Sequence, residues 1–178
     1  MPKFMPKFDV DLKDFLRTGE FGPIRLGMTK QETESLLGKP QDWGGAFPWW
    51  SEEKQSQASK SALPYADYPV WKYDEMEFHF GDSQKLFLIY CDHLDGLKKY
   101  GLVFSLSLRV FNSKKVVTYL EVQRYLASEN IAFKLSDNPV FGELILDSGV
   151  TIAYEYDDDT VSAISRSNEE FVGAPQET

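Results

Sequence analysis

The chain has 178 residues, 42% of them hydrophobic, and its 19 lysines and arginines against 28 aspartates and glutamates give a formal net charge of −9. A chain of this length and apolar content can bury one good core, as one domain or as two fused half-domains, which excludes a disordered protein. The acidic balance argues against nucleic acid or a membrane surface as the main partner, because both are polyanions that attract clustered lysine and arginine.

Cysteine and histidine are scarce in the sequence. The lone Cys91 excludes an internal disulfide, and two histidines leave little material for a transition-metal site, so we predict no metal and no cofactor. No stretch approaches the ~20 consecutive apolar residues of a membrane span. Residues 1–4 and 5–8 repeat Met-Pro-Lys-Phe without the apolar run of a signal peptide, so we expect a cytoplasmic protein that starts at Met1 or Met5.

Two short helices are predicted before residue 40. Residues 9–19 begin with acidic side chains, carry apolar ones at helical spacing and end at Gly19, within an N-terminal segment that we place at 1–20. In the second helix Thr29 and Glu32 form a capping box, and Gly38 follows its last turn. This helix opens a first α+β unit, 21–111.

Residues 38–69 show no clear periodicity, and three of the four tryptophans lie there, Trp43, Trp49 and Trp50. A polar stretch covers 51–61. A connection of this length without regular structure is unusual in a compact domain and is commonly a lid, a binding loop or a disordered insertion. We therefore interpret 38–69 as a Trp-rich insertion in the first unit.

Four strands are predicted after the insertion, at 70–73, 75–80, 85–91 and 102–110. The second and third alternate apolar and polar residues on either side of the turn residues 81–84, as in a β-hairpin. The alternation favours a register in which apolar side chains share one side of the hairpin. In that register these residues lie opposite each other: Phe80 and Lys85, Phe78 and Phe87, Met76 and Ile89.

A second unit, 112–166, repeats this order of elements. Asn112 and Ser113 are predicted to cap a helix over 114–129 whose apolar residues fall on one side. The polar tail, 167–178, is expected to be loose. Four further strands are separated by turn residues, at 133–135, 143–146, 150–156 and 161–166.

The succession of one helix and four strands therefore occurs twice. Such self-similarity favours duplication of one unit, although alternating hairpins also resemble one another by chance. We predict an α+β fold in which two units, each a helix plus a four-stranded antiparallel meander, form one compact domain. The two hairpins overlay without a gap, with these matches: Met76 and Ile152, Phe78 and Tyr154, Phe80 and Tyr156.

The segment from Gly27-Met28-Thr29 to Gly38-Lys39-Pro40, followed by Trp71-Lys72-Tyr73 and the strand at 75–80, resembles a motif of a known family. In the family of β-lactamase-inhibitor protein and the small barrel-assembly lipoproteins, a G-M-T-x-x-[E/Q]-x-x-x-L-L-G-x-P helix precedes a short antiparallel sheet, and the inhibitor is a tandem of two such units. The resemblance implies a non-catalytic module that binds another protein. Acidic proteins of this type are also similar to bacterial immunity proteins, which neutralise toxins.

Three polar clusters could carry chemistry, but each also has a structural explanation. In the predicted register His79 lies opposite Leu86, and Cys91 lies roughly 17 Å farther along that strand, so His79 and Cys91 are too far apart to bind one Zn²⁺. A zinc site at Cys91 and His93 would need further ligands from the loop that follows. The carboxylates of Glu75 and Glu77 could form an acid–base pair, but they are also typical of a solvated sheet face. Residues Asp157–Asp159 are more typical of a charged turn than of a calcium-binding loop. We predict no catalytic and no metal-binding residues, hence no enzyme.

Tryptophans and strand glutamates form the predicted partner-binding site. Tryptophan is enriched at interface hot spots because it buries a large area and keeps one hydrogen-bond donor, although these side chains could equally close the end of the sheet. We expect an intracellular binding module, inhibitor-like or immunity-like, whose acidic sheet face and Trp-rich loop contact a basic protein. The predicted contact residues are Trp43, Trp49, Trp50, Trp71, Glu75 and Glu77.

Two other interpretations stay open from the sequence. One is a small-ligand carrier or an enzyme with an aromatic pocket under a lid at 51–67. The other is a homodimer formed through an uncovered sheet edge.

Overall fold

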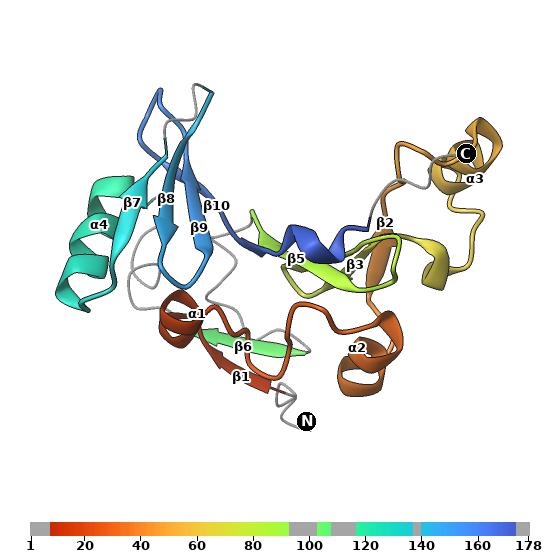
Figure 1. Ribbon diagram of the computed structural model, residues 1–178, viewed down its shortest axis with the longest axis horizontal. Helices are drawn as coiled ribbons and strands as arrows, with labels where there is room; N and C mark the ends of the chain where they lie inside the picture. The colour runs from red at the N-terminus through yellow and green to blue at the C-terminus, as the bar shows by residue number, and fades with distance from the viewer. Residues whose placement is uncertain (1–7, 93–102, 108–116, 137–139, 174–178) are drawn as a thin grey trace, which may run out of the picture.

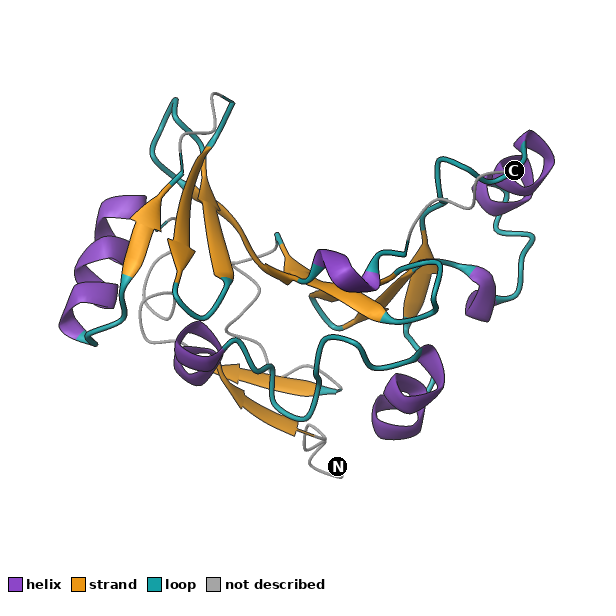
Figure 2. Ribbon diagram, viewed as in Figure 1, coloured by secondary structure: helices purple, strands orange, loops and turns teal. Residues whose placement is uncertain are grey.

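The computed structural model describes residues 8–92, 103–107, 117–136 and 140–173. The fold is α+β, as predicted, with both helices and strands in the described residues (Figure 2). It is built on one eight-stranded antiparallel sheet with the strand order β2-β3-β4-β5-β10-β9-β8-β7. Each half of the sheet is a meander of four strands. The strands are β2 (Asp42–Gly44), β3 (Val70–Tyr73), β4 (Met76–Phe80), β5 (Leu86–Cys91), β7 (Phe133–Leu135), β8 (Gly142–Leu146), β9 (Val150–Tyr154) and β10 (Val161–Ser167).

Helices α1 (Leu12–Thr18), α2 (Lys30–Leu37) and α4 (Tyr119–Ser128) send their buried side chains into the core on one face of this sheet. A two-stranded parallel sheet, β1 (Phe8–Asp11) with β6 (Phe104–Ser107), lies beside α1 on that side (Figure 1). The remaining helices are α3 (Glu52–Ser59), η1 (Tyr65–Asp67) and η4 (Glu169–Phe171).

Phe21 lies at the centre of the core and joins three elements. Its ring meets those of Phe15 in α1, Phe104 in β6 and Phe78 in β4 edge-on, with centroid separations of 5.4, 5.2 and 6.1 Å. Edge-to-face aromatic pairs contribute about 0.5–1.5 kcal/mol each beyond the area they bury. This cluster holds α1 and the small parallel sheet against the first half of the large sheet.

Strands β5 and β10 join the two halves. Arg166 on β10 lies on the core face between its partners Ile89 on β5 and Val150 on β9, and its Nη1 donates a hydrogen bond to the Ser148 carbonyl. The guanidinium also lies against Gly19, the residue with positive φ that ends α1, where a Cβ atom would come within 2.5 Å of Arg166 Nε. Gly19 is thus the predicted helix stop and also leaves room for this arginine.

The two halves use the same connection between helix and sheet. Thr29 caps α2 and Thr118 caps α4, each in a capping box with the glutamate three residues later. Each threonine also bridges the residue just before the last strand of its half, Thr29 to Lys85 and Thr118 to Thr160. A residue with positive φ precedes each bridge partner: Gln84 at +58° and Asp159 at +59°.

A β-bulge interrupts the last hairpin of each half at the same place. On β5 the extra residue is Phe87, between the pairs Phe80–Leu86 and His79–Leu88. On β10 it is Ser162, between the pairs Tyr154–Val161 and Ala153–Ala163. Bridges and bulges together fix these correspondences between the halves: His79 with Ala153, Phe80 with Tyr154, Phe87 with Ser162, Leu88 with Ala163, and Tyr90 with Ser165.

Tyr90 and Ser165 not only correspond but also pair with each other across the β5–β10 junction. A local two-fold axis that relates the two halves therefore passes between them. The neighbouring pairs fit the same axis. Ile164 corresponds to Ile89 and Arg166 to Cys91, and the pair Ile164–Cys91 mirrors the pair Ile89–Arg166. Cys91 is buried.

The hairpin register predicted from alternation is wrong. Phe80 pairs with Leu86, and Phe78 pairs with Ile89, because the bulge adds one residue to β5. Phe87 therefore leaves the core face and its ring meets that of His79, with centroids 6.3 Å apart.

The gap-free overlay of the two hairpins is also wrong, since Phe80 corresponds to Tyr154 and not to Tyr156. The turn of the second half, 156–159, is one residue longer than the turn at 82–84. On β4 and β9 the overlay is wrong by two residues, which keeps each side chain on its face of the sheet, so alternation does not detect the error there.

Four predicted elements differ from the structure in extent or place. The first helix begins at Leu12 because residues 8–11 form β1. Helix α4 begins after Thr118, and the cap predicted at Asn112 and Ser113 lies outside the described residues. The insertion contains β2, α3 and η1, and β2 supplies the fourth strand of the first meander. The described part of the strand predicted at 102–110 is β6, which pairs with β1 in the other sheet.

We expect the two capping boxes to contribute similarly to stability. Thr29→Ala and Thr118→Ala should each lower the free energy of unfolding by about 0.5–2 kcal/mol, because each removes the acceptor for a first-turn amide. Urea unfolding followed by circular dichroism measures the loss. Ser35→Ala, at an exposed position inside α2, is the control and should change stability by less than about 0.5 kcal/mol.

Candidate functional site

The face of the large sheet opposite α1, α2 and α4 carries the candidate site, which we call the open face. Side chains there are half-buried and alternate with buried ones that point into the core, as on β4 and β8. Along β4, β5, β10, β9 and β8 the open-face residues are Glu77, His79, Phe87, Leu88, Tyr90, Ser162, Ala163, Ser165, Thr151, Ala153, Glu143 and Ile145.

In the first half of the open face, Glu77 is paired on both carboxylate oxygens. Lys72 Nζ lies 2.5 Å from Oε1, and His79 Nε2 lies 3.0 Å from Oε2. The hydrogen bond to Glu77 raises the pKa of Lys72, whereas burial lowers the pKa of His79 despite that same carboxylate. His79 is therefore neutral at pH 7 and donates from Nε2, since a carboxylate only accepts. The charge of Glu77 is largely neutralised locally.

In the second half, small residues leave a hollow of about 310 Å³ in the open face. The cross-strand pairs Ala153–Ala163 and Thr151–Ser165 lie in its middle. It is also lined by two aromatic residues, one serine and two carboxylates, and none of the described residues that line it is a cation: Tyr90, Phe141, Ser162, Glu143 and Glu155.

Tyr90 lies at the edge of the hollow toward β5. Burial raises the pKa of the Tyr90 phenol, and the carboxylates of Asp92 and Glu77, which do not line the hollow, raise it further. The phenol is therefore neutral at pH 7 and can act as a hydrogen-bond donor or acceptor.

Two of the predicted contact residues belong to the core side of the sheet. Trp71 is 1% exposed and donates a hydrogen bond from Nε1 to the Tyr65 carbonyl, so it is not accessible to a partner. Trp43 pairs with Trp71 across β2 and β3, packs on Tyr65, and has Lys39 Nζ 5.0 Å from its ring centroid. These two tryptophans close the end of the sheet.

Trp49 and Trp50 form a second aromatic group with Phe47, before α3. Trp50 is half-buried, with Lys54 Nζ 4.2 Å from its ring centroid. Trp49 is 45% exposed, stacks on Phe47 with centroids 4.7 Å apart, and donates from Nε1 to Asp82 at 2.9 Å. Trp49 is thus the predicted tryptophan with the largest accessible surface, and Asp82 fixes it beside the β4–β5 turn.

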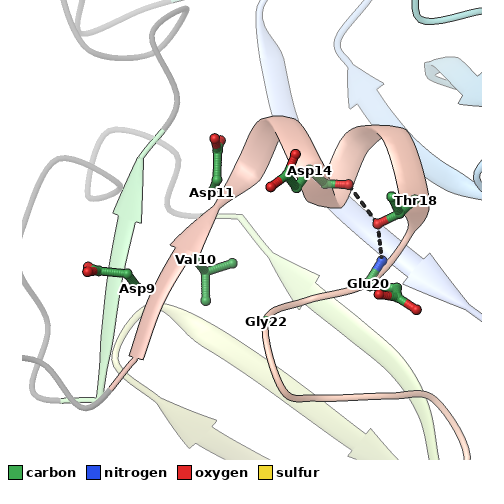
Figure 3. A pocket seen from close by; sticks show the side chains of 7 residues that line it. All are labelled: Asp9, Val10, Asp11, Asp14, Thr18, Glu20 and Gly22. Carbon is green, nitrogen blue, oxygen red and sulfur yellow. Dashed lines mark hydrogen bonds between the residues drawn. The ribbon is translucent and has the colours of Figure 1, made fainter.

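A second acidic hollow, of about 280 Å³, lies along β1 and α1 and is lined by Asp9, Asp11, Asp14 and Glu20. Figure 3 shows that the carboxylates of Asp9, Asp11 and Glu20 point in different directions. Asp11 caps α1 by accepting from the Lys13 amide, and Glu20 pairs with Arg25 at 3.2 Å. These carboxylates serve local structure.

The described residues contain no group of three or more histidine, cysteine or acidic residues that could hold a metal ion. His93 lies outside the described ranges. Within those ranges, Asp158 accepts hydrogen bonds from Thr160 in the β9–β10 turn, as expected of a charged turn.

The sequence pointed to Glu75, in the turn before β4, and to Glu77, on β4, but it missed the hollow in the second half. The hollow exists because Ala153 and Ala163 are small, and small residues form no motif. A correct overlay of the two halves could have revealed it, since the same positions in the first half are His79 and Leu88.

Comparisons with protein-family models, with curated proteins and with solved structures find no match to this chain. No helix in the described ranges is long and apolar enough to cross a membrane.

The buried, neutral His79 predicts a specific pH dependence of stability. The pKa of His79 in the folded protein lies below the usual value near 6.5. As the pH falls, His79 therefore takes up a proton in the unfolded chain before it does so in the folded protein. The free energy of unfolding consequently decreases below about pH 6.5. Urea unfolding between pH 7.5 and 5.5 should show a smaller loss in His79→Gln than in the wild type. Equal losses in the two proteins would contradict a buried neutral histidine.

Proposed function

We propose that the protein is a non-catalytic, intracellular protein-binding module of the inhibitor or immunity type, and that its open face binds a basic surface of another protein. The observation that carries the proposal is the half-buried open face with a hollow lined by Tyr90, Phe141, Glu143 and Glu155. Aromatic side chains beside small residues favour a protein contact, because the rings bury much area at low entropic cost.

Charge supports a basic partner. The chain carries a net charge of −9, and the described residues that line the hollow include two carboxylates and no cation. Opposite potentials accelerate association and make it sensitive to salt, since ions screen charges over about 8–10 Å at physiological ionic strength.

The Trp-rich segment contributes less to the proposed surface than the sequence suggested. Trp49 remains a contact candidate because it is 45% exposed, whereas Trp71 is buried and Trp43 packs at the sheet end. Residues 52–59, part of the expected lid, form α3, whose Gln55 donates to the Trp50 carbonyl at 2.7 Å.

Charge reversal tests which acidic surface binds the partner. The tagged wild type should capture one or more basic proteins from a lysate of the source cells, and the captured amount should fall as salt rises from 50 to 500 mM. A double variant with Glu143→Lys and Glu155→Lys should lose this capture, because it places two cations in the hollow. Quantitative mass spectrometry of the eluates measures the change.

The matched control carries the same change of charge on the other acidic hollow, with Asp9→Lys and Asp14→Lys, both exposed positions. It should keep the capture. Loss in the control but not in the open-face variant, or equal retention in both, would overturn the open face as the binding surface. Circular dichroism of both variants checks that they are folded.

A further inference from the structure

The hollow in the open face results from a difference between the two halves at corresponding positions. The first half has His79, Phe87 and Leu88 where the second has Ala153, Ser162 and Ala163. The two hairpins have the same bulge and the same pairing on either side of it. In the first half these positions form a ridge, where the His79 ring meets Phe87 and Tyr90 with centroids 6.3 Å away in each case.

The small residues of the second half expose the sheet between two walls. Tyr90 on β5 stands on one side, directly paired with Ser165, and Glu143 on β8 stands on the other, directly paired with Ala153. Phe141 precedes β8 and Glu155 follows β9, and both line the same hollow. A side chain that enters there meets rings, hydroxyls and carboxylates.

We infer that this hollow is a receptor for an arginine side chain of the partner, and this inference rests on the proposed function. A guanidinium matches the lining better than other cations, because it stacks on aromatic faces and bonds carboxylates through a planar set of donors. An ammonium is a compact, strongly hydrated charge that gains less from two rings. Thr151 and Ser165 supply hydroxyl acceptors on the floor of the hollow.

The test uses a small arginine probe and the full chain, so it needs no partner. In ¹⁵N-edited NMR titrations, N-acetyl-arginine amide should cause saturable shifts at the amides of Ala153, Ala163 and Ser165. N-acetyl-citrulline amide, the uncharged isostere, should bind at least about tenfold more weakly, because it cannot form charge-assisted bonds. Equal shifts with citrulline, or shifts that miss the hollow, would overturn the inference.

Variants that restore the side chains of the first half sharpen the test. Ala163→Leu gives the second half the residue found at Leu88, and it should abolish the shifts by filling the hollow. Ala127→Leu adds the same side chain at an exposed position of α4 and should leave them unchanged. The double variant with Glu143→Gln and Glu155→Gln keeps shape and removes charge, so it should weaken arginine binding by about tenfold.

The inference and the proposed function can fail separately. Salt-dependent capture that depends on Glu143 and Glu155, together with no binding of the arginine probe, would overturn the inference and leave the proposed function intact. Arginine binding without any effect of the charge-reversal variant on capture would overturn the proposed function and support a receptor for free cationic ligands. Tighter binding of N-acetyl-lysine amide than of the arginine probe would also overturn the inference.

Discussion

The pairing of β5 with β10 determines how the rest of the molecule is arranged. It continues one four-stranded meander into the other, so that the halves share a single sheet and a single core. Ile89 and Ile164 lie at this junction and are almost fully buried, and each apolar side chain of that size contributes about 1.5–3 kcal/mol on burial. Because α1, α2 and α4 all pack on the core side, none of these three helices covers the opposite side of the junction, which is the open face.

The junction also explains why the open face is not uniform. Corresponding backbone positions meet across the local two-fold axis at Tyr90 and Ser165, so large side chains of one half stand beside small side chains of the other. The ridge of His79, Phe87 and Leu88 lies on one side of the axis and the hollow around Ala153 and Ala163 on the other, and Tyr90 touches both. Glu77 lies on the ridge side with its charge neutralised by Lys72, while Glu143 and Glu155 line the hollow. Shape and charge thus change together across the axis.

The sequence predicted those parts of the fold that depend on local chemistry. Thr29 with Glu32 located one helix, Gly19 ended another, and alternation located the strands of both central hairpins. The cap of α4 is Thr118, in the same T-x-x-E motif with Glu121, and not the predicted pair Asn112 and Ser113. Pairings between distant segments were not predictable, because nothing local selects β10 rather than residues 102–110 as the neighbour of β5, or places β2 beside β3.

The site was less predictable than the fold. Tryptophan content suggested a surface, yet Trp71 is needed to cover the end of the sheet and is buried. The bulge at Phe87 moves one aromatic residue from the expected core face to the open face, and a bulge has no reliable signal in an alternating pattern. The hollow depends on the absence of large side chains at Ala153 and Ala163, which only the three-dimensional correspondence of the halves reveals.

The two-fold axis between Tyr90 and Ser165 has a consequence for how this surface can vary. A single unit on its own would expose the edge of its last strand, and two identical copies would pair through that edge as a symmetric dimer. In such a dimer every substitution occurs twice, so a ridge on one side of the axis requires a ridge on the other. With both units in one chain, each position is encoded separately, and one half can be hollowed while the other keeps its large side chains. Asymmetry of the binding surface is thus available to the single chain and denied to the dimer.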